Sequence, residues 1–223
     1  MAKQQVVVIG LGRFGSALAE ELVREGHEVL GVDSDHSVVQ QMSTRLTHVV
    51  QANAVDEETL RRLGLADFDA AVVGLTDVLE SSILVTLALK RLGVPRVISK
   101  ARNEVHGEIL MRVGADRVIY PERDTGLRLA HGWTSAEITD SLDIVEGYIV
   151  SRVAVPEELV GRTVGEALGE RRQEVSLLAL ARGSRVTVYP ASQEELQRND
   201  VLVLAGAIEH VEAFFASLHR GGS

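Results

Sequence analysis

The chain of 223 residues has no cysteine, only three lysines, few aromatic residues and no long hydrophobic run. The absence of cysteine excludes disulfides, thiolate metal sites and a cysteine nucleophile. The longest apolar run, residues 201–208, is eight residues long, whereas a membrane-spanning helix needs about 20. Residues 6–9 lead straight into a glycine-rich segment, unlike the start of a secretory signal. We therefore expect a cytoplasmic protein.

Positive charge is in the minority. The chain carries 32 acidic and 23 basic side chains, a net charge of −9, and both signs are spread along its whole length. Without a basic tail or face, general binding to nucleic acid or to an anionic membrane is not expected. Hydrophobic residues make up 45% of the chain and charged residues 25%, as in globular proteins. The length suits two small domains.

Short β-branched runs alternate with helical patterns through the first part of the chain. The runs are continuously apolar, which is typical of parallel strands covered by helices on both faces. This alternation predicts an α/β fold, a Rossmann-like doubly wound parallel sheet. Strands are expected at 6–9, 28–32, 48–51, 70–73, 96–99 and 117–120, with helices near 13–24, 36–45, 57–63, 78–92 and 105–112.

The alternation changes after residue 120. Residues 121–135 read as a further helix, and the remainder predicts a smaller α+β domain. Its strands are expected at 148–155, 175–181, 186–189 and 201–204, and its helices at 163–168 and 211–218. We expect domains at 1–140 and 141–223, with a helical join around 121–140. Apolar Leu177, Ala179 and Ala181 are expected on one strand face, which predicts that the small domain dimerises.

The segment Gly10-Leu11-Gly12-Arg13-Phe14-Gly15 fits the dinucleotide-binding pattern G-x-G-x-x-G. In this pattern the first glycine makes a tight turn, the second lets backbone approach phosphate, and the third lets strand and helix pack closely. The free N–H groups at the start of the following helix favour an anion. Asp33 ends the second strand, where an acid accepts hydrogen bonds from ribose hydroxyls and repels a 2′-phosphate. The sequence therefore predicts a nucleotide site that does not favour NADP.

The loops at the carboxyl ends of the other strands are expected to line the same crevice. They bring Asn53 and Ala54 after the third strand, Leu75 and Thr76 after the fourth, and Lys100 and Arg102 after the fifth. Asn53 is read equally well as a turn residue. Lys100 and Arg102 are also consistent with a solvated strand end that binds no ligand. Together with Arg13 inside the glycine segment, these cations offer more positive charge than one pyrophosphate needs, which favours a triphosphate.

The sequence offers no evident catalytic machinery. The three tyrosines lack the lysine four residues on that short-chain dehydrogenases use, and the histidines have no metal-binding spacing. His106, near the start of a helix beside the crevice, is the one histidine placed to act in catalysis. We therefore predict a binding protein rather than an enzyme. A small NAD-dependent oxidoreductase and a redox-sensing DNA-binding regulator are the alternatives, although the latter needs a basic helix-turn-helix that the sequence lacks.

Six segments resemble, in order and spacing, the nucleotide-binding RCK domain of the cytosolic regulatory subunits of Ktr and Trk potassium-uptake systems. They are GLGRFGSALAEEL, GHEVLGVDSD, QANAVDEETLRRLGL, ADFDAAVVGL, VISKARN and GADRVIYPERDTGLRLA. The resemblance covers residues 4–140, and ELVGRTVGEAL together with the segment from SLLALARG to VLVLAG extends it to the family's small C-terminal domain. One copy of each domain resembles the Ktr type.

The resemblance implies a role for each matching residue. Arg13 reaches the terminal phosphate of ATP, partly across a dimer interface, and Asp33 holds the ribose with Asp35 close by. Glu122 matches a carboxylate that helps hold a cation near the phosphates, although its place after Pro121 also suits a first-turn helix acid. The remaining matches are Asn53 and Ala54 near the adenosine and Lys100 after the fifth strand.

The resemblance also implies partners. A homodimer would assemble into a larger ring, an octamer in the family, beneath a membrane potassium-transport subunit that it gates according to ATP and ADP. NAD remains an open alternative as the nucleotide. Some C-terminal domains of the family bind cyclic di-AMP between two subunits, but the arginine-rich stretch 169–175 departs from them. A domain that only dimerises is the alternative there.

Overall fold

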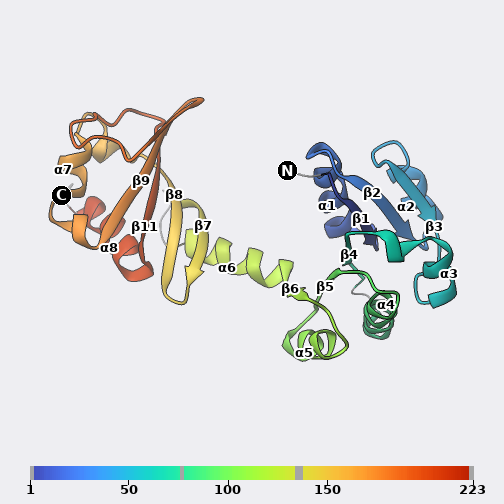
Figure 1. Ribbon diagram of the computed structural model, residues 1–223. Helices are drawn as coiled ribbons and strands as arrows, with labels where there is room; N and C mark the ends of the chain where they lie inside the picture. Colours follow the sequence, from blue (N-terminus) through green and yellow to red (C-terminus); the bar gives the residue numbers. More distant parts are fainter. Residues whose placement is uncertain (1–2, 76–77, 134–137, 221–223) are drawn as a thin grey trace. The chain divides into compact units, whose positions relative to one another are not determined.

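The computed structural model describes residues 3–75, 78–133 and 138–220, which form two compact units divided between Pro121 and Glu122 (Figure 1). The expected boundary lay after residue 140. The difference arises because nearly all of helix α6 (Pro121–Trp133) belongs to the second unit, and because strand β7 (Ile138–Val145) already begins before that point.

The first unit contains one parallel sheet of six strands in the order β3-β2-β1-β4-β5-β6. The order reverses beside β1, since β1 pairs with β2 on one side and with β4 on the other. This is the doubly wound arrangement that the sequence predicts. The strands are β1 (Gln5–Ile9), β2 (Glu28–Asp33), β3 (His48–Gln51), β4 (Ala70–Val73), β5 (Arg96–Lys100) and β6 (Arg117–Ile119).

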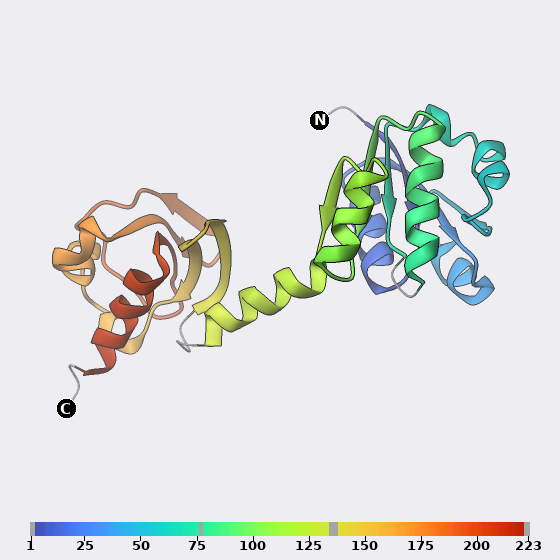
Figure 2. The ribbon, with the colours of Figure 1, turned by 90° about the horizontal axis from the view of Figure 1, so that it is seen from below.

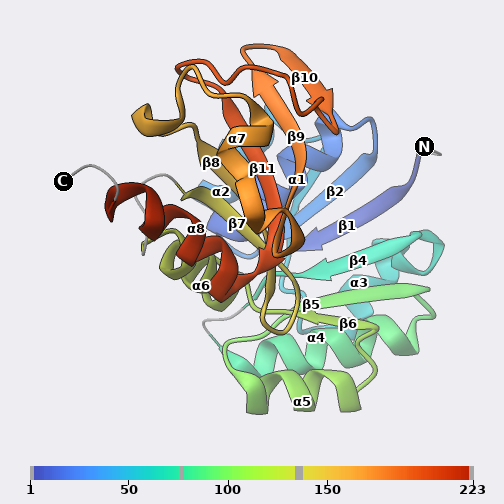
Figure 3. The ribbon, with the colours of Figure 1, turned by 90° about the vertical axis from the view of Figure 1, so that its left-hand side faces the viewer.

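Helices cover both faces of this sheet. Val7 and Ile9 of β1 pack with Leu60 and Leu89 on the side of α3 and α4, while Val8 packs with the α1 and α2 side. The apolar strand runs are thus buried on both faces, as continuous runs require. Helices α4 and α5 lie side by side (Figures 2 and 3). The helices are α1 (Arg13–Arg24), α2 (His36–Met42), α3 (Glu57–Arg62), α4 (Leu79–Arg91) and α5 (Glu104–Arg112), with a 3-10 turn at Leu65–Asp67.

The second unit contains an antiparallel sheet of five strands in the order β10-β9-β11-β8-β7. Helix α8 packs against β9 and β11, and its Val211 and Phe214 join the buried core (Figure 1). After α6 and β7, this unit consists of β8 (Tyr148–Ala154), α7 (Val164–Leu168), β9 (Val175–Arg182), β10 (Arg185–Val188), β11 (Val201–Ala207) and α8 (Ile208–Arg220), with 3-10 turns at Glu157–Leu159 and Gly169–Gln173.

A register shift in β9 corrects one expectation about its faces. Val203 of β11 pairs with Ala179, but the next residue pairs with Leu177, so β9 carries an extra residue there. Leu177 therefore packs against the buried core, and only Ala179 and Ala181 face the other side. Such a bulge reverses the alternation of side chains, which periodicity alone does not reveal.

The segment that leads into β11 is held in place by hydrogen bonds to a buried carboxylate. Asp200 is fully buried, and its side chain accepts hydrogen bonds from Nε and Nη2 of Arg182 at 2.9 and 2.8 Å and from the N–H of Gln197 at 2.8 Å. The Arg182 guanidinium holds the pKa of Asp200 below its usual value.

Among the described residues, no helix is long and apolar enough to cross a membrane.

Candidate functional site

The glycine loop between β1 and α1 is fixed from both sides. Gly10 adopts a φ of +88°, which favours glycine, and its N–H donates to the carbonyl of Val32 at 2.8 Å. On the other side, the N–H of Gly74 donates to the carbonyl of Ile9 at 2.7 Å. The loop is therefore held between the carboxyl ends of β2 and β4, at the point where the strand order reverses.

The other two glycines of the motif differ in what surrounds them. A Cβ at Gly15 would lie 1.9 Å from the carbonyl oxygen of Gly10, so this close approach of helix to loop requires glycine. A Cβ at Gly12 would meet no protein atom within 4 Å. Gly12 therefore borders open space at the start of α1, where the first N–H groups of a helix have no partner within it. A phosphate group fits this position chemically.

Arg13 is the first residue of α1 and is exposed. Its guanidinium makes no hydrogen bond or ion pair with any residue that the structure describes. No acidic residue occupies the first turn of α1, so the positive end of the helix dipole is not neutralised locally. Phe14, in contrast, is half-buried and packs with the α1 side of the core. The loop thus presents one cation and buries one aromatic ring.

The two acids after β2 have different structural roles. Asp33 accepts hydrogen bonds from the N–H of Leu11 at 2.7 Å and from the N–H of Asp35 at 2.9 Å, one on each oxygen. Asp35 caps α2, since its carboxylate accepts from the N–H and hydroxyl of Ser37 at 2.7 and 2.6 Å. These bonds lower the pKa of Asp35, with the Ser37 hydroxyl the main cause. Asp33 is thereby oriented beside the glycine loop, and each oxygen keeps lone pairs for a further donor.

The loops after β3 and β4 contribute less side-chain chemistry than the sequence suggests. Asn53 is exposed and accepts a hydrogen bond from the N–H of Val55 at 3.2 Å, which is the turn role left open above. The Ala54 side chain is 6% exposed and packs in the core, so only its backbone can face a ligand. Leu75 is half-buried, and its Cδ2 would lie 2.8 Å from a Cβ at Gly10. Thr76 lies outside the described residues.

The end of β5 brings a buried cation to the glycine loop. The Lys100 side chain is 7% exposed, and its Nζ lies 5.8 Å from the centroid of the Phe14 ring, within the range of a cation–π contact. Two residues later Arg102 is exposed. The structure therefore brings Gly10, Gly12, Arg13, Phe14, Gly15, Asp33, Leu75 and Lys100 together at the carboxyl ends of β1, β2, β4 and β5.

His106 is fully buried on α5 and has both ring nitrogens engaged. Its Nδ1 accepts from the N–H of Arg102 at 3.2 Å, and its Nε2 lies 2.9 Å from the hydroxyl of Ser82 on α4. Burial lowers the pKa of His106. A neutral, buried imidazole with two partners does not suit the catalytic role considered from the sequence.

Glu122 belongs to the second unit, where it is exposed in the first turn of α6. This agrees with its alternative reading as a first-turn helix acid. Across the described residues, no group of three or more histidines and acids is arranged to hold a metal ion.

Comparison with known proteins gives matches over both units. The TrkA-N domain family matches residues 6–121, and the TrkA-C domain family matches residues 149–219. The Ktr system potassium uptake protein C of Bacillus subtilis (strain 168) is 34% identical over 212 residues, covering 95% of this chain and 96% of that protein. Protein A of the same system and organism is 32% identical over 211 residues, covering 95% of each chain.

Solved structures agree with the fold. The GsuK RCK domain has a TM-score of 0.68 at 20% identity, covering 96% of this chain and 48% of that one. The GsuK channel bound to NAD has a TM-score of 0.52 at 24% identity, covering 99% and 39%. GsuK bound to ADP has a TM-score of 0.50 at 18% identity, covering 62% and 35%. At these identities the likeness establishes the architecture.

Proposed function

We propose that this chain, which belongs to the family that joins a TrkA-N domain to a TrkA-C domain, senses ATP and ADP for a potassium transporter. Members of this family are called RCK proteins and include the Ktr potassium uptake proteins A and C. The family assignment made from the sequence motifs is confirmed. The family is regulatory and non-enzymatic, which removes the oxidoreductase alternative. Membership of the Ktr group implies a membrane potassium transporter as partner.

The open space over Gly12 is the observation that carries the nucleotide part of this proposal. A Cβ there would meet nothing within 4 Å, so the start of α1 can receive phosphate oxygens on its free N–H groups. Asp33, already fixed against the loop through Leu11, would accept the ribose hydroxyls. One GsuK structure holds NAD and another ADP. Both ligands share the adenosine and the phosphates that such a site would bind.

Charge at the site favours ATP and ADP over NAD. Arg13 is exposed, with no ion pair among the described residues, and Lys100 adds a second cation beside Phe14. The pyrophosphate of NAD is a diester, whereas ADP and ATP both end in a terminal phosphate that carries additional negative charge, and ATP has a third phosphate that also needs neutralising. The full set proposed to surround the nucleotide is Gly10, Gly12, Arg13, Phe14, Gly15, Asp33, Asp35, Asn53, Ala54, Leu75, Thr76, Lys100 and Arg102, with Glu122 toward a cation near the phosphates.

Whether ATP or ADP is bound would change the contacts between subunits of the assembly. A ligand shifts a conformational equilibrium only by the difference in its affinity for the two states. If Arg13 meets the terminal phosphate from a neighbouring subunit, then exchanging ATP for ADP removes a contact that joins two subunits. A ring of such dimers, an octamer in the family, at the inner face of the membrane would transmit that change to the transporter.

The second unit supplies a surface for the homodimer. Val186 and Val188 of β10 are 60% and 64% exposed, and they pair with Ala181 and Ala179 on the face away from the buried core. Exposed apolar surface of this kind favours a protein partner.

Binding of cyclic di-AMP to the second unit remains a prediction. A shallow hollow of about 490 Å³ in this unit is lined by Thr163, Gly165, Glu166, Gly169, Ser192 and Gln193. These described lining residues include a carboxylate but no cation that would pair with phosphate.

Two experiments test the proposal. Calorimetry on the purified chain with ATP, ADP, NADH and cyclic di-AMP measures which ligand binds, and we expect ATP and ADP to bind most tightly. Reconstitution of the cognate transporter in liposomes then measures potassium flux as ATP is exchanged for ADP in the presence of this protein. Flux that ignores both the protein and the nucleotide would refute the regulatory role.

A further inference from the structure

A chain of buried polar groups runs between α4, β5 and α5 of the first unit. Thr86 and Ser82 lie one turn apart on α4, and the hydroxyl of Thr86 donates to the carbonyl of Ser82 at 2.7 Å. Thr86 also meets the hydroxyl of Ser99 on β5 at 2.8 Å, and Ser82 meets His106 on α5. All four residues are fully buried. Buried polar groups of this kind are costly unless each is hydrogen-bonded.

The partners fix the direction of each bond. Nδ1 of His106 faces the N–H of Arg102, which can only donate, so Nδ1 is the acceptor and Nε2 carries the proton. The Ser82 hydroxyl donates to the carbonyl of Leu79 at 2.8 Å and therefore accepts from Nε2. His106 is thus a neutral imidazole that holds the start of α4 with one nitrogen and the loop after β5 with the other.

That loop carries the cations of the candidate nucleotide site. Consecutive residues at the end of β5 point to opposite faces, Ser99 to Thr86 on α4 and Lys100 to Phe14 beside the glycine loop. Arg102 lies two residues after Lys100, and its backbone N–H donates to Nδ1 of His106. A shift of this segment would therefore move Lys100 and Arg102 relative to the phosphates proposed to bind at Gly12.

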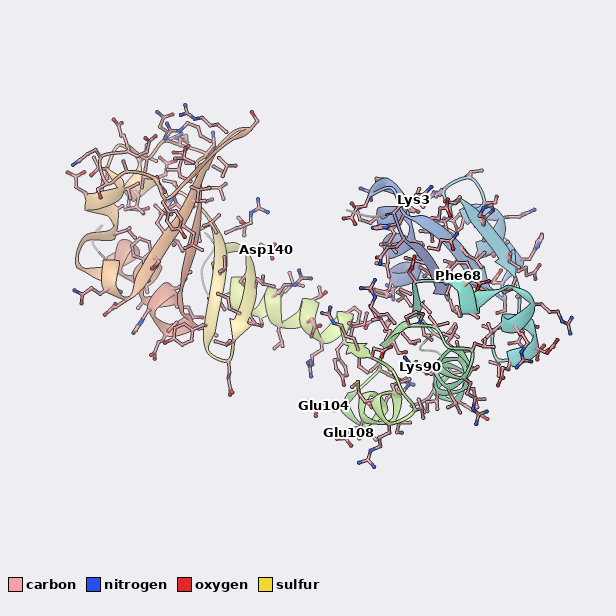
Figure 4. All side chains as sticks on the ribbon, viewed as in Figure 1. Lys3, Phe68, Lys90, Glu104, Glu108 and Asp140 are labelled. Carbon is pink, nitrogen blue, oxygen red and sulfur yellow. The ribbon has the colours of Figure 1, made fainter. Side chains whose placement is uncertain are left out.

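The position of His106 is itself closely defined. A Cβ at Gly107 would lie 1.9 Å from the hydroxyl of Tyr120, so α5 packs directly on that ring. The opposite side of α5 carries Glu104 and Glu108, which are exposed (Figure 4). His106 faces inward from a helix that packs closely against Tyr120, which suits a fixed point for the loop.

We propose that His106 is a positioning residue of the nucleotide site, and that its Nδ1 sets the place of Lys100 and Arg102 by holding the backbone N–H of Arg102. This inference rests on the proposed function, since it requires a nucleotide at the glycine loop. Only the bond to Arg102 matters for binding. The bond from Nε2 to Ser82 contributes to the stability of the unit.

Two variants separate these bonds. In His106→Asn the amide oxygen takes the place of Nδ1 and keeps the acceptor for Arg102, while the donor to Ser82 is lost. In His106→Gln the amide nitrogen takes the place of Nε2 and keeps the donor to Ser82, while the acceptor for Arg102 is lost. Both remove part of a buried ring and should lower the midpoint of thermal unfolding. Val105→Ala, at an exposed neighbouring position, is the control.

We expect His106→Gln to weaken ADP and ATP binding about tenfold in calorimetry, the effect of one hydrogen bond, and His106→Asn to stay within about threefold of the unaltered chain. Equal losses in both variants, or no loss in His106→Gln, would overturn the positioning role. If the unaltered chain binds neither nucleotide, then the proposed function fails instead. Thermal unfolding of each variant verifies that the chains compared are folded.

Discussion

The carboxylate of Asp33 accepts a hydrogen bond from the backbone N–H of Leu11 at 2.7 Å. The acid at the end of β2 is therefore part of the framework of the glycine loop as well as the candidate partner of a ribose. Its other oxygen is engaged by the N–H of Asp35. The orientation of Asp33 is thus fixed by the fold before any ligand is present.

Replacing glycines of the loop should separate binding from folding. Gly12→Val places its side chain in open space, so we expect the free energy of unfolding to fall by no more than about 1 kcal/mol, while binding of both ATP and ADP is lost. Gly15→Ala drives a methyl group into the Gly10 carbonyl and should destabilise the unit itself. Calorimetry and chemical denaturation measure the two effects. Micromolar binding retained in folded Gly12→Val would place the nucleotide elsewhere.

Arg13→Ala should weaken ATP binding more than ADP binding, because only ATP has the terminal phosphate. Arg24→Ala, at the far end of the same helix, removes an exposed cation paired with Glu21 and should leave both affinities unchanged. Titration of each variant with both nucleotides gives the ratio. A uniform loss for ATP and ADP in Arg13→Ala would assign the side chain to the shared phosphates.

Asp200→Asn should destabilise the second unit by about 1–3 kcal/mol, since the buried carboxylate that accepts from Arg182 and from the N–H of Gln197 becomes a neutral amide with only one acceptor oxygen. The folded pKa of Asp200 is lowered by Arg182, so its stabilisation is complete above the unfolded pKa of about 4 and is lost as pH falls through the folded pKa. Thermal unfolding between pH 7 and pH 3 measures this. Arg198→Ala, which removes an exposed pair with Glu157, is the control and should change stability by less than about 1 kcal/mol.

Residues 1–121 alone should fold and bind ATP, because the first unit has its own sheet and its own core. Circular dichroism and calorimetry of the truncated chain test this against the full chain. Loss of folding on truncation would mean that the two units form one folding unit.

Val186→Lys together with Val188→Lys should weaken self-association of the full chain, since both side chains are exposed on the face away from the core. The matched control is Val105→Lys with Met111→Lys, which adds the same two charges at exposed apolar positions of α5 in the first unit. Mass measured in solution over a range of concentrations compares the two pairs. The same mass for both double variants and the unaltered chain would exclude this face from the dimer.

The first unit was predictable because each local signal agreed with the others. The apolar runs, the helical patterns between them and the glycine loop all specified parallel strands with helices between them, and the six strands lie where those patterns place them. The second unit offered weaker signals. Strand β7 carries acids at 140 and 143, which break the apolar run that marks a strand. The bulge in β9 leaves Leu177 on the core side and Ala179 and Ala181 on the other, because one extra residue reverses the alternation of side chains between the two parts of the strand.

The sequence predicted the parts of the site that depend on backbone conformation, but it predicted less well which side chains near the site are buried. Gly10 and Gly15 have the surroundings that the motif requires. Ala54, by contrast, gave no sign in the sequence that its methyl group belongs to the core. The buried polar contacts of His106 and Ser99 could have been suspected from Ser82 and Thr86, which lie four residues apart on one face of α4, since such polar pairs on a buried face need partners.

The fixed glycine loop has a consequence for the rate of exchange at the proposed nucleotide site. Its backbone is held by the Gly10–Val32 and Gly74–Ile9 hydrogen bonds, so the entropy of ordering the loop is lost during folding and not when a ligand arrives. At the proposed site, association would then require no ordering of the glycine loop, and differences in affinity between ATP and ADP would fall mainly on their dissociation rates. Occupancy of the loop would follow the cellular supply of nucleotide on the timescale of dissociation.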